Sequence, residues 1–209
     1  MNYTMSYQLF KTDVLFYQRL LKATGFYTGK MDGKWGPLTD AADKAFTTES
    51  HRIAEEYGTF DIRSEGNIFS LIPKAQILAR QFLDKLTSAG NDVRIISGTR
   101  TYSEQDLIYK QGRFGSKLPK VTNARGGQSN HNFGIAWDIG LFEDGHYSTL
   151  DSKYKKIAND VLADFPDLQW GGNWTSFKDY PHYQLKAVSD SVTQIRSLFE
   201  KGMPYVSEP

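Results

Sequence analysis

Hydrophobic positions near the N-terminus predict two helices separated by a turn-rich loop. The first helix ends before Gly25, a residue that readily adopts the left-handed conformation of a helix end. Its apolar positions at helical spacing are Val14, Tyr17, Leu20 and Leu21. Four glycines and an Asp-Gly step between residues 25 and 36 require tight turns, after which Thr39 is expected to cap a second helix. This second helix carries Ala42 and Phe46.

Further helices are predicted from residue 73 onward. Pro73 suits the first turn of a helix, and apolar residues then follow the helical period until Gly90. We expect this apolar face to pack on a sheet, and it comprises Ala75, Leu78, Ala79, Phe82, Leu83 and Leu86. Asp151 is expected to cap a helix that bears Tyr154, Ile157, Ala158, Val161, Leu162 and Phe165. A last helix carries Val192, Ile195 and Phe199 and ends at Gly202.

Strand signals lie between these helices. Residues 93–96 form a short β-branched run, and residues 133–142 are rich in strand formers and precede a hairpin signal at Asp144-Gly145. Residues 59–72 have the composition of a connection between domains. Strands and helices occur in unequal groups, so the expected fold class is α+β. We expect a small all-α domain at residues 1–60 and, at 61–209, a domain with a small antiparallel sheet flanked by helices.

Composition and charge narrow the possible functions. No apolar run approaches the length of a membrane span, so we expect no membrane insertion. A formal net charge of +1 gives no broad electrostatic reason to bind nucleic acid, and we expect none as a partner. The chain contains no Cys, which excludes disulfides, thiolate nucleophiles and Cys-based zinc sites. His and carboxylates remain as the strong metal ligands.

The first six residues lack a basic region followed by an apolar stretch and a small-residue cleavage site. We therefore expect no signal peptide, synthesis in the cytoplasm, and any export by another route. We also expect the chain to act as a monomer.

Two of the four histidines lie close in sequence to a carboxylate. Gly134 permits a bend that would bring His131 over the strand face that carries Asp138, so these two side chains can share a ligand. Asp179 precedes His182 by three residues, which is close without requiring that both contact the same atom. One of this second pair could therefore bind a metal ion while the other handles protons.

Two histidines and one carboxylate, with a fourth position left to water, form the ligand set of a catalytic zinc site. Zinc in such a site makes hydroxide available near neutral pH and polarises a carbonyl, which is hydrolytic chemistry. The spacing alone also fits histidines that are satisfied in a core or lie at the surface. His51, on a charged helix, and His146, after the hairpin turn, are expected to be solvated.

The segment Ser129–Asp138 meets every fixed position of SxHxxGxAxD, and residues 170–184 place an acidic residue three positions before a histidine. These segments resemble the two motifs of a zinc peptidase family. The family contains D-alanyl-D-alanine carboxypeptidases, dipeptidases and L-alanyl-D-glutamate endopeptidases of phage endolysins, and its fold is α+β. The resemblance implies that His131, Asp138 and His182 bind Zn²⁺. It also implies that Asp179 takes the proton of the attacking water and returns it to the leaving amine.

A third segment, residues 97–105, resembles the family stretch in which an arginine follows Ser-Gly-x and a glutamine follows five residues later. Arg100 is then a candidate to grip a substrate carboxylate or to stabilise charge on the carbonyl oxygen, although it could instead cap backbone carbonyls. The same resemblance assigns Gln105 and Ser129 to substrate binding.

Residues 8–58 resemble the helical peptidoglycan-binding module of wall hydrolases. The shared pattern has a glutamine on the first helix, here Gln18, followed by Gly-Phe-Tyr-x-Gly, Asp-Gly and Gly-Pro-x-Thr. The chain departs from this pattern at Thr47, where a glutamine is usual. The alternative is a helical hairpin that only packs on the catalytic domain.

Residues 67–74, 98–113, 122–124 and 127–129 most resemble the L-alanyl-D-glutamate endopeptidase branch. The resemblance implies cleavage of the L-Ala–D-Glu bond in bacterial peptidoglycan stem peptides, after phage release or another export route. Two alternatives remain, a D-alanyl-D-alanine carboxypeptidase and a wall-binding protein whose metal site is silent. The presence of Asp179 argues against a wall-binding protein without catalytic activity, because binding alone needs no carboxylate beside the ligand histidine.

Overall fold

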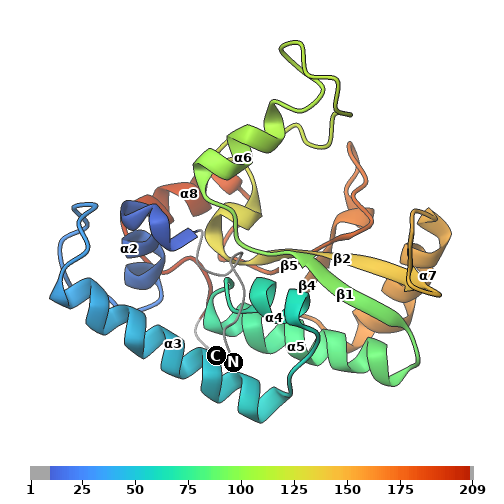
Figure 1. The fold of residues 1–209 in the computed structure, drawn as a ribbon, viewed down its shortest axis with the longest axis horizontal. Helices are drawn as coiled ribbons and strands as arrows, with labels where there is room; N and C mark the ends of the chain where they lie inside the picture. Colours follow the sequence, from blue (N-terminus) through green and yellow to red (C-terminus); the bar gives the residue numbers. More distant parts are fainter. Residues whose placement is uncertain (1–9, 208–209) are drawn as a thin grey trace.

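A computed structural model describes residues 10–207, so the first six residues, on which the expectation about a signal peptide rests, lie outside the described residues. One five-stranded sheet, antiparallel at every pairing, has the order β1-β2-β5-β4, with β3 paired to β2 (Figure 1). The strands are β1 (Asp92–Ser97), β2 (Ala136–Glu143), β3 (His146–Ser148), β4 (Leu168–Trp170) and β5 (His182–Leu185). The α+β class and the small antiparallel sheet predicted from the sequence are confirmed.

Seven α-helices have both ends within the described residues and pack on this sheet or on one another. They are α2 (Val14–Ala23), α3 (Pro37–Tyr57), α4 (Ile62–Ile68), α5 (Pro73–Ser88), α6 (Tyr102–Tyr109), α7 (Asp151–Val161) and α8 (Val192–Glu200). Short 3-10 helices span Asn130–Phe133, Leu162–Asp164 and Gly171–Asn173. None of the described helices is long and apolar enough to cross a membrane.

Helix α5 packs on the sheet, as its apolar face predicts. The Phe82 ring lies 4.6 Å from the Tyr183 ring of β5 and 6.1 Å from the Trp137 ring of β2, measured between centroids. All three side chains are buried. In Figure 1, α4 and α5 lie on one side of the sheet, while α6 with its following loop and the segment between β4 and β5 rise on the other side.

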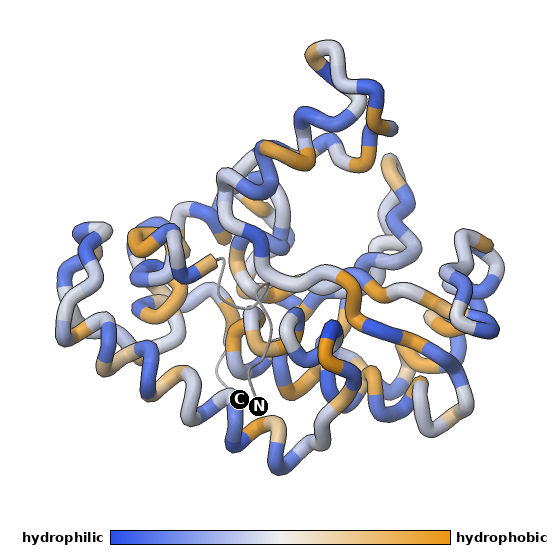
Figure 2. Tube along the Cα trace, in the orientation of Figure 1, coloured by the Kyte–Doolittle hydropathy of each residue, from blue (hydrophilic) through white to orange (hydrophobic). Residues whose placement is uncertain are grey.

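Helices α2 and α3 belong to the same hydrophobic core as the sheet and its helices. The Phe16 ring of α2 lies 5.2 Å from the Phe199 ring of α8, and on α3 Ser50 Oγ accepts a hydrogen bond of 2.9 Å from Gln76 Nε2 of α5. The buried positions of α3 recur at helical spacing, and Figure 2 shows hydrophilic and hydrophobic stretches alternating along it. The N-terminal helices thus pack directly on the rest of the molecule.

The buried side chain of Gln18 holds the loop between α2 and α3. Its Oε1 accepts hydrogen bonds from the backbone amides of Asp32 (3.0 Å) and Gly33 (2.9 Å), and its Nε2 donates to the Lys34 carbonyl and to Thr39 Oγ1. The expectation that Thr39 caps the second helix is wrong. Helix α3 begins at Pro37 with Gly36 as its N-cap, because proline suits the first helical turn, and Thr39 is a buried partner of Gln18.

The predicted connection at residues 59–72 is an ordered part of the core. It contains α4, which Asp61 caps by accepting hydrogen bonds from the amides of Arg63 and Ser64. Glu65 of α4 forms a buried, bidentate ion pair with Arg80 of α5, and both N–O distances are 2.8 Å. Because both charges are buried, removing either partner would leave the other uncompensated.

The β2–β3 hairpin forms at Asp144-Gly145 as predicted. Both residues have positive φ, 48° and 77°, the conformation that a tight two-residue hairpin turn requires. The expected cap of the following helix is wrong, because Asp151 is the first residue of α7 and Leu150 occupies the N-cap without a side-chain hydrogen bond. Asp151 still lies in the first turn, where a negative charge is favourable.

Candidate active site

Three adjoining segments bring His131, Asp138 and His182 together. His131 lies on the 3-10 helix Asn130–Phe133, which ends at Gly134 in the left-handed conformation with φ of 67°. The chain then enters β2, where Asp138 pairs directly with His182, the first residue of β5. The positive φ favours glycine at position 134, and a Cβ there would make a tight contact of 3.1 Å with the Ile72 side chain.

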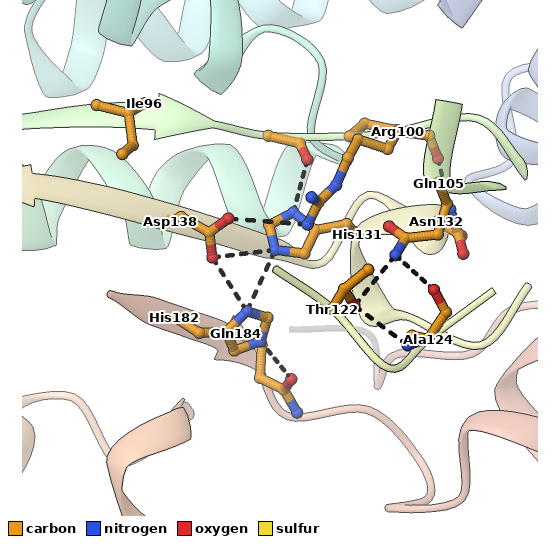
Figure 3. A network of polar contacts seen from close by, with 12 residues as sticks. Ile96, Arg100, Gln105, Thr122, Ala124, His131, Asn132, Asp138, His182 and Gln184 are labelled. Carbon is orange, nitrogen blue, oxygen red and sulfur yellow. Dashed lines mark hydrogen bonds and ion pairs between the residues drawn. The ribbon is translucent and has the colours of Figure 1, made fainter. Parts of the chain in front are cut away.

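The donor atoms of these residues form a nearly equilateral triangle (Figure 3). His131 Nε2, Asp138 Oδ1 and His182 Nδ1 are each 3.2 Å from the other two. Tetrahedral zinc with bonds of about 2.0–2.1 Å has ligand atoms separated by about 3.3 Å. The three donors therefore fit zinc, with a fourth position left open. Among the described residues, this is the cluster of three ligand-type side chains that could hold a metal ion.

Each histidine has its second ring nitrogen engaged by an acceptor. His131 Nδ1 donates to the backbone carbonyl of Gly98 over 2.7 Å, and His182 Nε2 donates to Gln184 Oε1 over 2.9 Å. The other two ring nitrogens, His131 Nε2 and His182 Nδ1, face Asp138. Metal-binding histidines are oriented in this manner by their outer contacts.

Burial and neighbouring charges shift the pKa values of the three side chains in different directions. Burial, assisted by the charge of Arg100, lowers the pKa of His131 to about 4. Burial would raise the pKa of Asp138, but the two histidines and Arg100 hold it well below its ordinary value. Burial would likewise lower the pKa of His182, yet its hydrogen bond to Asp138 and the charge of that carboxylate raise it. A neutral His131 and an ionised Asp138 are the forms that bind a cation.

Arg100 lies at the edge of the triangle, and Asp179 interacts electrostatically with Asp138 and His182. Arg100 Nη2 is 3.7 Å from Asp138 Oδ2, and Arg100 Nε is buried without a hydrogen-bond partner among the described residues. Asp179 is partly buried, and burial followed by the negative charge of Asp138 raises the pKa of its carboxyl. The two residues thus bring a permanent cation and a carboxyl of raised proton affinity to one place.

A cavity of about 730 Å³ opens over the three donors. Its floor includes His131, Asp138 and His182, and Arg100, Ser129 and Asp179 also line it. One wall is the loop after α6, at residues 121–124, and the facing wall carries Trp174 and Phe177 from the segment between β4 and β5. This size is within the range of small-molecule and peptide sites.

Gln105 does not line this cavity, unlike the other residues assigned to the site from the sequence. It is buried on α6, and its Nε2 donates to the Ala124 carbonyl over 2.9 Å, which supports the cavity wall from behind. Sequence reasoning did not single out Asn130 and Gln184, which also line the cavity and bond each other over 2.8 Å. Gln184 lies two residues after His182 on β5, and side chains two residues apart on a strand point to the same side of the sheet. This spacing could have indicated from the sequence that Gln184 lies beside His182.

Comparison with known proteins identifies the family. Residues 122–185 match the family model described as D-alanyl-D-alanine carboxypeptidase. The chain is 38% identical over 120 residues to the peptidoglycan L-alanyl-D-glutamate endopeptidase CwlK of Bacillus subtilis strain 168, covering 52% of this chain and 71% of the relative.

Two solved structures are also similar. The L-Ala D-Glu endopeptidase ChiX of Serratia marcescens has a TM-score of 0.46 and 26% identity, over 61% of this chain and 89% of that chain. A Zn(II) complex of a mutant vancomycin-resistance D,D-pentapeptidase VanY has a TM-score of 0.43 and 17% identity, over 64% of this chain and 80% of that chain. On the match to CwlK, this chain belongs to the zinc peptidase family that contains D-alanyl-D-alanine carboxypeptidases and L-alanyl-D-glutamate endopeptidases.

Proposed function

We propose that this protein is a zinc-dependent peptidoglycan endopeptidase that cleaves the L-Ala–D-Glu bond of stem peptides. The observation that carries the proposal is the triangle of His131 Nε2, Asp138 Oδ1 and His182 Nδ1, with sides of 3.2 Å, at the floor of an open cavity. The identity to an endopeptidase of the same family supports the choice of bond.

Zinc is the cofactor that the family implies, and His131, Asp138 and His182 would hold it. When bound, zinc supplies a Lewis acid that polarises a carbonyl and lowers the pKa of water. Asp138 contributes the negative charge of the set. The Gly98 carbonyl and Gln184 keep the two imidazole rings turned with one nitrogen toward Asp138.

Asp179 is the proposed proton carrier. Its carboxyl lines the cavity and has a raised pKa, so it can take a proton from the attacking water and pass it to the leaving amine. Its backbone is fixed at both ends, because its amide donates to the Gly171 carbonyl over 3.1 Å and its carbonyl accepts from the His182 amide. The proton carrier is thereby held beside a proposed ligand.

Arg100 is the proposed electrophilic group. Its guanidinium is a permanent cation at the cavity wall, suited to a developing negative charge on the carbonyl oxygen or to a carboxylate of the substrate. We assign Ser129, which lines the cavity, to substrate contact. The contacts of Gln105 favour an indirect part in substrate binding, through its support of residues 122–124 in the cavity wall.

The scissile bond is tested by digestion of purified sacculi and mass spectrometry of the new termini. We expect peptides with a new N-terminal D-Glu and L-Ala left on the muramyl side. Release of terminal D-Ala alone would establish the carboxypeptidase alternative, and the absence of any product from zinc-loaded protein would favour the silent wall-binding alternative. Light scattering of the purified protein checks the proposed monomeric state.

We further propose that the loop between α2 and α3 contacts the wall. Trp35 of this loop is 44% exposed although its ring stacks on that of Tyr17, so it presents a rigid aromatic face to solvent. Deletion of residues 1–60 would remove part of the shared core, so a surface substitution gives a cleaner test.

Trp35→Ala is expected to weaken sedimentation with sacculi several-fold while leaving hydrolysis of a soluble muropeptide unchanged, because tethering raises local substrate concentration without altering the cavity. Leu38→Ala, at a neighbouring residue that is 61% exposed, serves as the control. Equal sedimentation of the wild type and both variants would remove the support for a wall-binding loop.

A further inference from the structure

A row of amide side chains connects His182 with the protein surface. His182 Nε2 lies 2.9 Å from Gln184 Oε1, and Gln184 Nε2 donates to Gln169 Oε1 of β4 over 2.7 Å. Gln169 Nε2 then donates to Asp190 Oδ1 over 3.1 Å. Gln184 is 8% exposed, whereas Asp190 is exposed in the loop before α8.

The carboxylate at the outer end sets the direction of every bond in this row. An ionised carboxylate only accepts hydrogen bonds, so Gln169 must turn its NH₂ group toward Asp190 and its carbonyl toward Gln184. Gln184 must then turn its own NH₂ group toward Gln169 and its carbonyl toward His182. Asn130 Nδ2 donates to this same carbonyl over 2.8 Å, which reinforces that orientation.

His182 has a competing acceptor on its other side. Asp138 Oδ1 lies 3.2 Å from His182 Nδ1, so a proton on Nδ1 would be bonded to Asp138. That tautomer would place a hydrogen on the atom that faces the metal position. His131 is held differently, because its Nδ1 donates a hydrogen bond of 2.7 Å directly to the backbone carbonyl of Gly98.

We infer that Gln184, Gln169 and Asp190 form a positioning relay that holds the His182 proton on Nε2 and leaves the Nδ1 lone pair for zinc. The inference rests on the proposed function, in which His182 is a metal ligand. None of the three relay residues is itself a ligand in that proposal. The exposed carboxylate of Asp190 thus selects the tautomer of a buried histidine through two amides.

Long-range ¹H–¹⁵N NMR of the metal-free protein, at a pH where the His182 ring is neutral, reports the tautomer directly. We expect Nε2–H in the wild type and in Gln184→Glu, which keeps an acceptor at this position. Gln184→Met keeps the side-chain length but loses the acceptor, so the proton is expected to move to Nδ1. Loss of such an outer contact typically weakens metal binding by about 10–100-fold, and chelator competition should give a zinc Kd raised by this factor.

The outer end of the relay is tested with Asp190→Ala, for which we expect a mixture of His182 tautomers and a zinc Kd raised several-fold. Asp160→Ala removes an exposed carboxylate of α7, paired with Lys156, and is the charge-matched control that should change neither quantity. An Nε2–H tautomer in a folded Gln184→Met variant, or identical behaviour of Asp190→Ala and Asp160→Ala, would overturn the relay. Failure of the wild type to bind zinc would instead contradict the proposed function, because the tautomer is read without metal or substrate.

Discussion

Replacing His131, Asp138 or His182 by alanine is expected to abolish both zinc binding and hydrolysis. Each substitution removes one of three donor atoms that lie 3.2 Å apart, and two protein ligands are too few to hold the ion against solvent. We expect the zinc content to fall from about one ion per chain to less than about a tenth of that value, since binding requires the complete ligand set. Elemental analysis of purified, dialysed protein measures this directly.

His146→Ala provides the matched control. His146 is an exposed histidine on β3 and is not a residue of the cavity lining, so its loss should leave zinc content and turnover unchanged. Circular dichroism of each variant separates loss of the ion from loss of the fold. Stoichiometric zinc together with full activity in any of the three ligand variants would show that the ligand assignment is wrong.

Asp179→Asn is expected to retain zinc and lose turnover by about 10²–10⁴-fold, the usual contribution of a positioned acid or base. The amide has nearly the shape of the carboxyl group but cannot take a proton from water. Hydrolysis of a soluble muropeptide, measured beside zinc content on the same sample, distinguishes this variant from the ligand variants. Substrate affinity should change little, because the proposed task of Asp179 is proton transfer.

Asp167→Asn is the control for this second experiment, because Asp167 is an exposed carboxylate that does not line the cavity. Its activity should match the wild type. Near-normal turnover of Asp179→Asn would contradict the proton-carrier role, and loss of zinc from that variant would instead make Asp179 part of the metal site.

Local sequence patterns predicted much of the fold because they depend on neighbouring residues. The apolar spacing that predicts the helices α2, α5 and α8 is a property of the segments themselves, and the turn at Asp144-Gly145 needs only the positive φ that these residues tolerate. Periodicity did not reveal β4 and β5, which are three and four residues long and too short to display it. Helix α6 was also not predicted, although Thr101 and Glu104 form a capping box at its start.

The sequence by itself determined the class of chemistry, because without Cys only His and carboxylates remain as strong metal ligands, and two motifs supply them. The sequence patterns left undecided whether those side chains meet. Pairing of β2 with β5 sets Asp138 opposite His182, and the turn at Gly134 brings His131 to both. Only tertiary structure could decide this, because the 3.2 Å contacts join residues up to 51 positions apart.

Tertiary packing also decided the environment of the site and the placement of the N-terminal helices. Gln105 proved to support the cavity wall, and Gln184 proved to be the partner of His182. The sequence pattern of residues 8–58 predicted two helices but left open what they pack against. The Phe16–Phe199 contact shows that α2 packs against α8, a partner 183 positions away in the chain. Burial of apolar surface is non-directional, so the partner of an apolar face depends on which other faces the whole fold leaves uncovered.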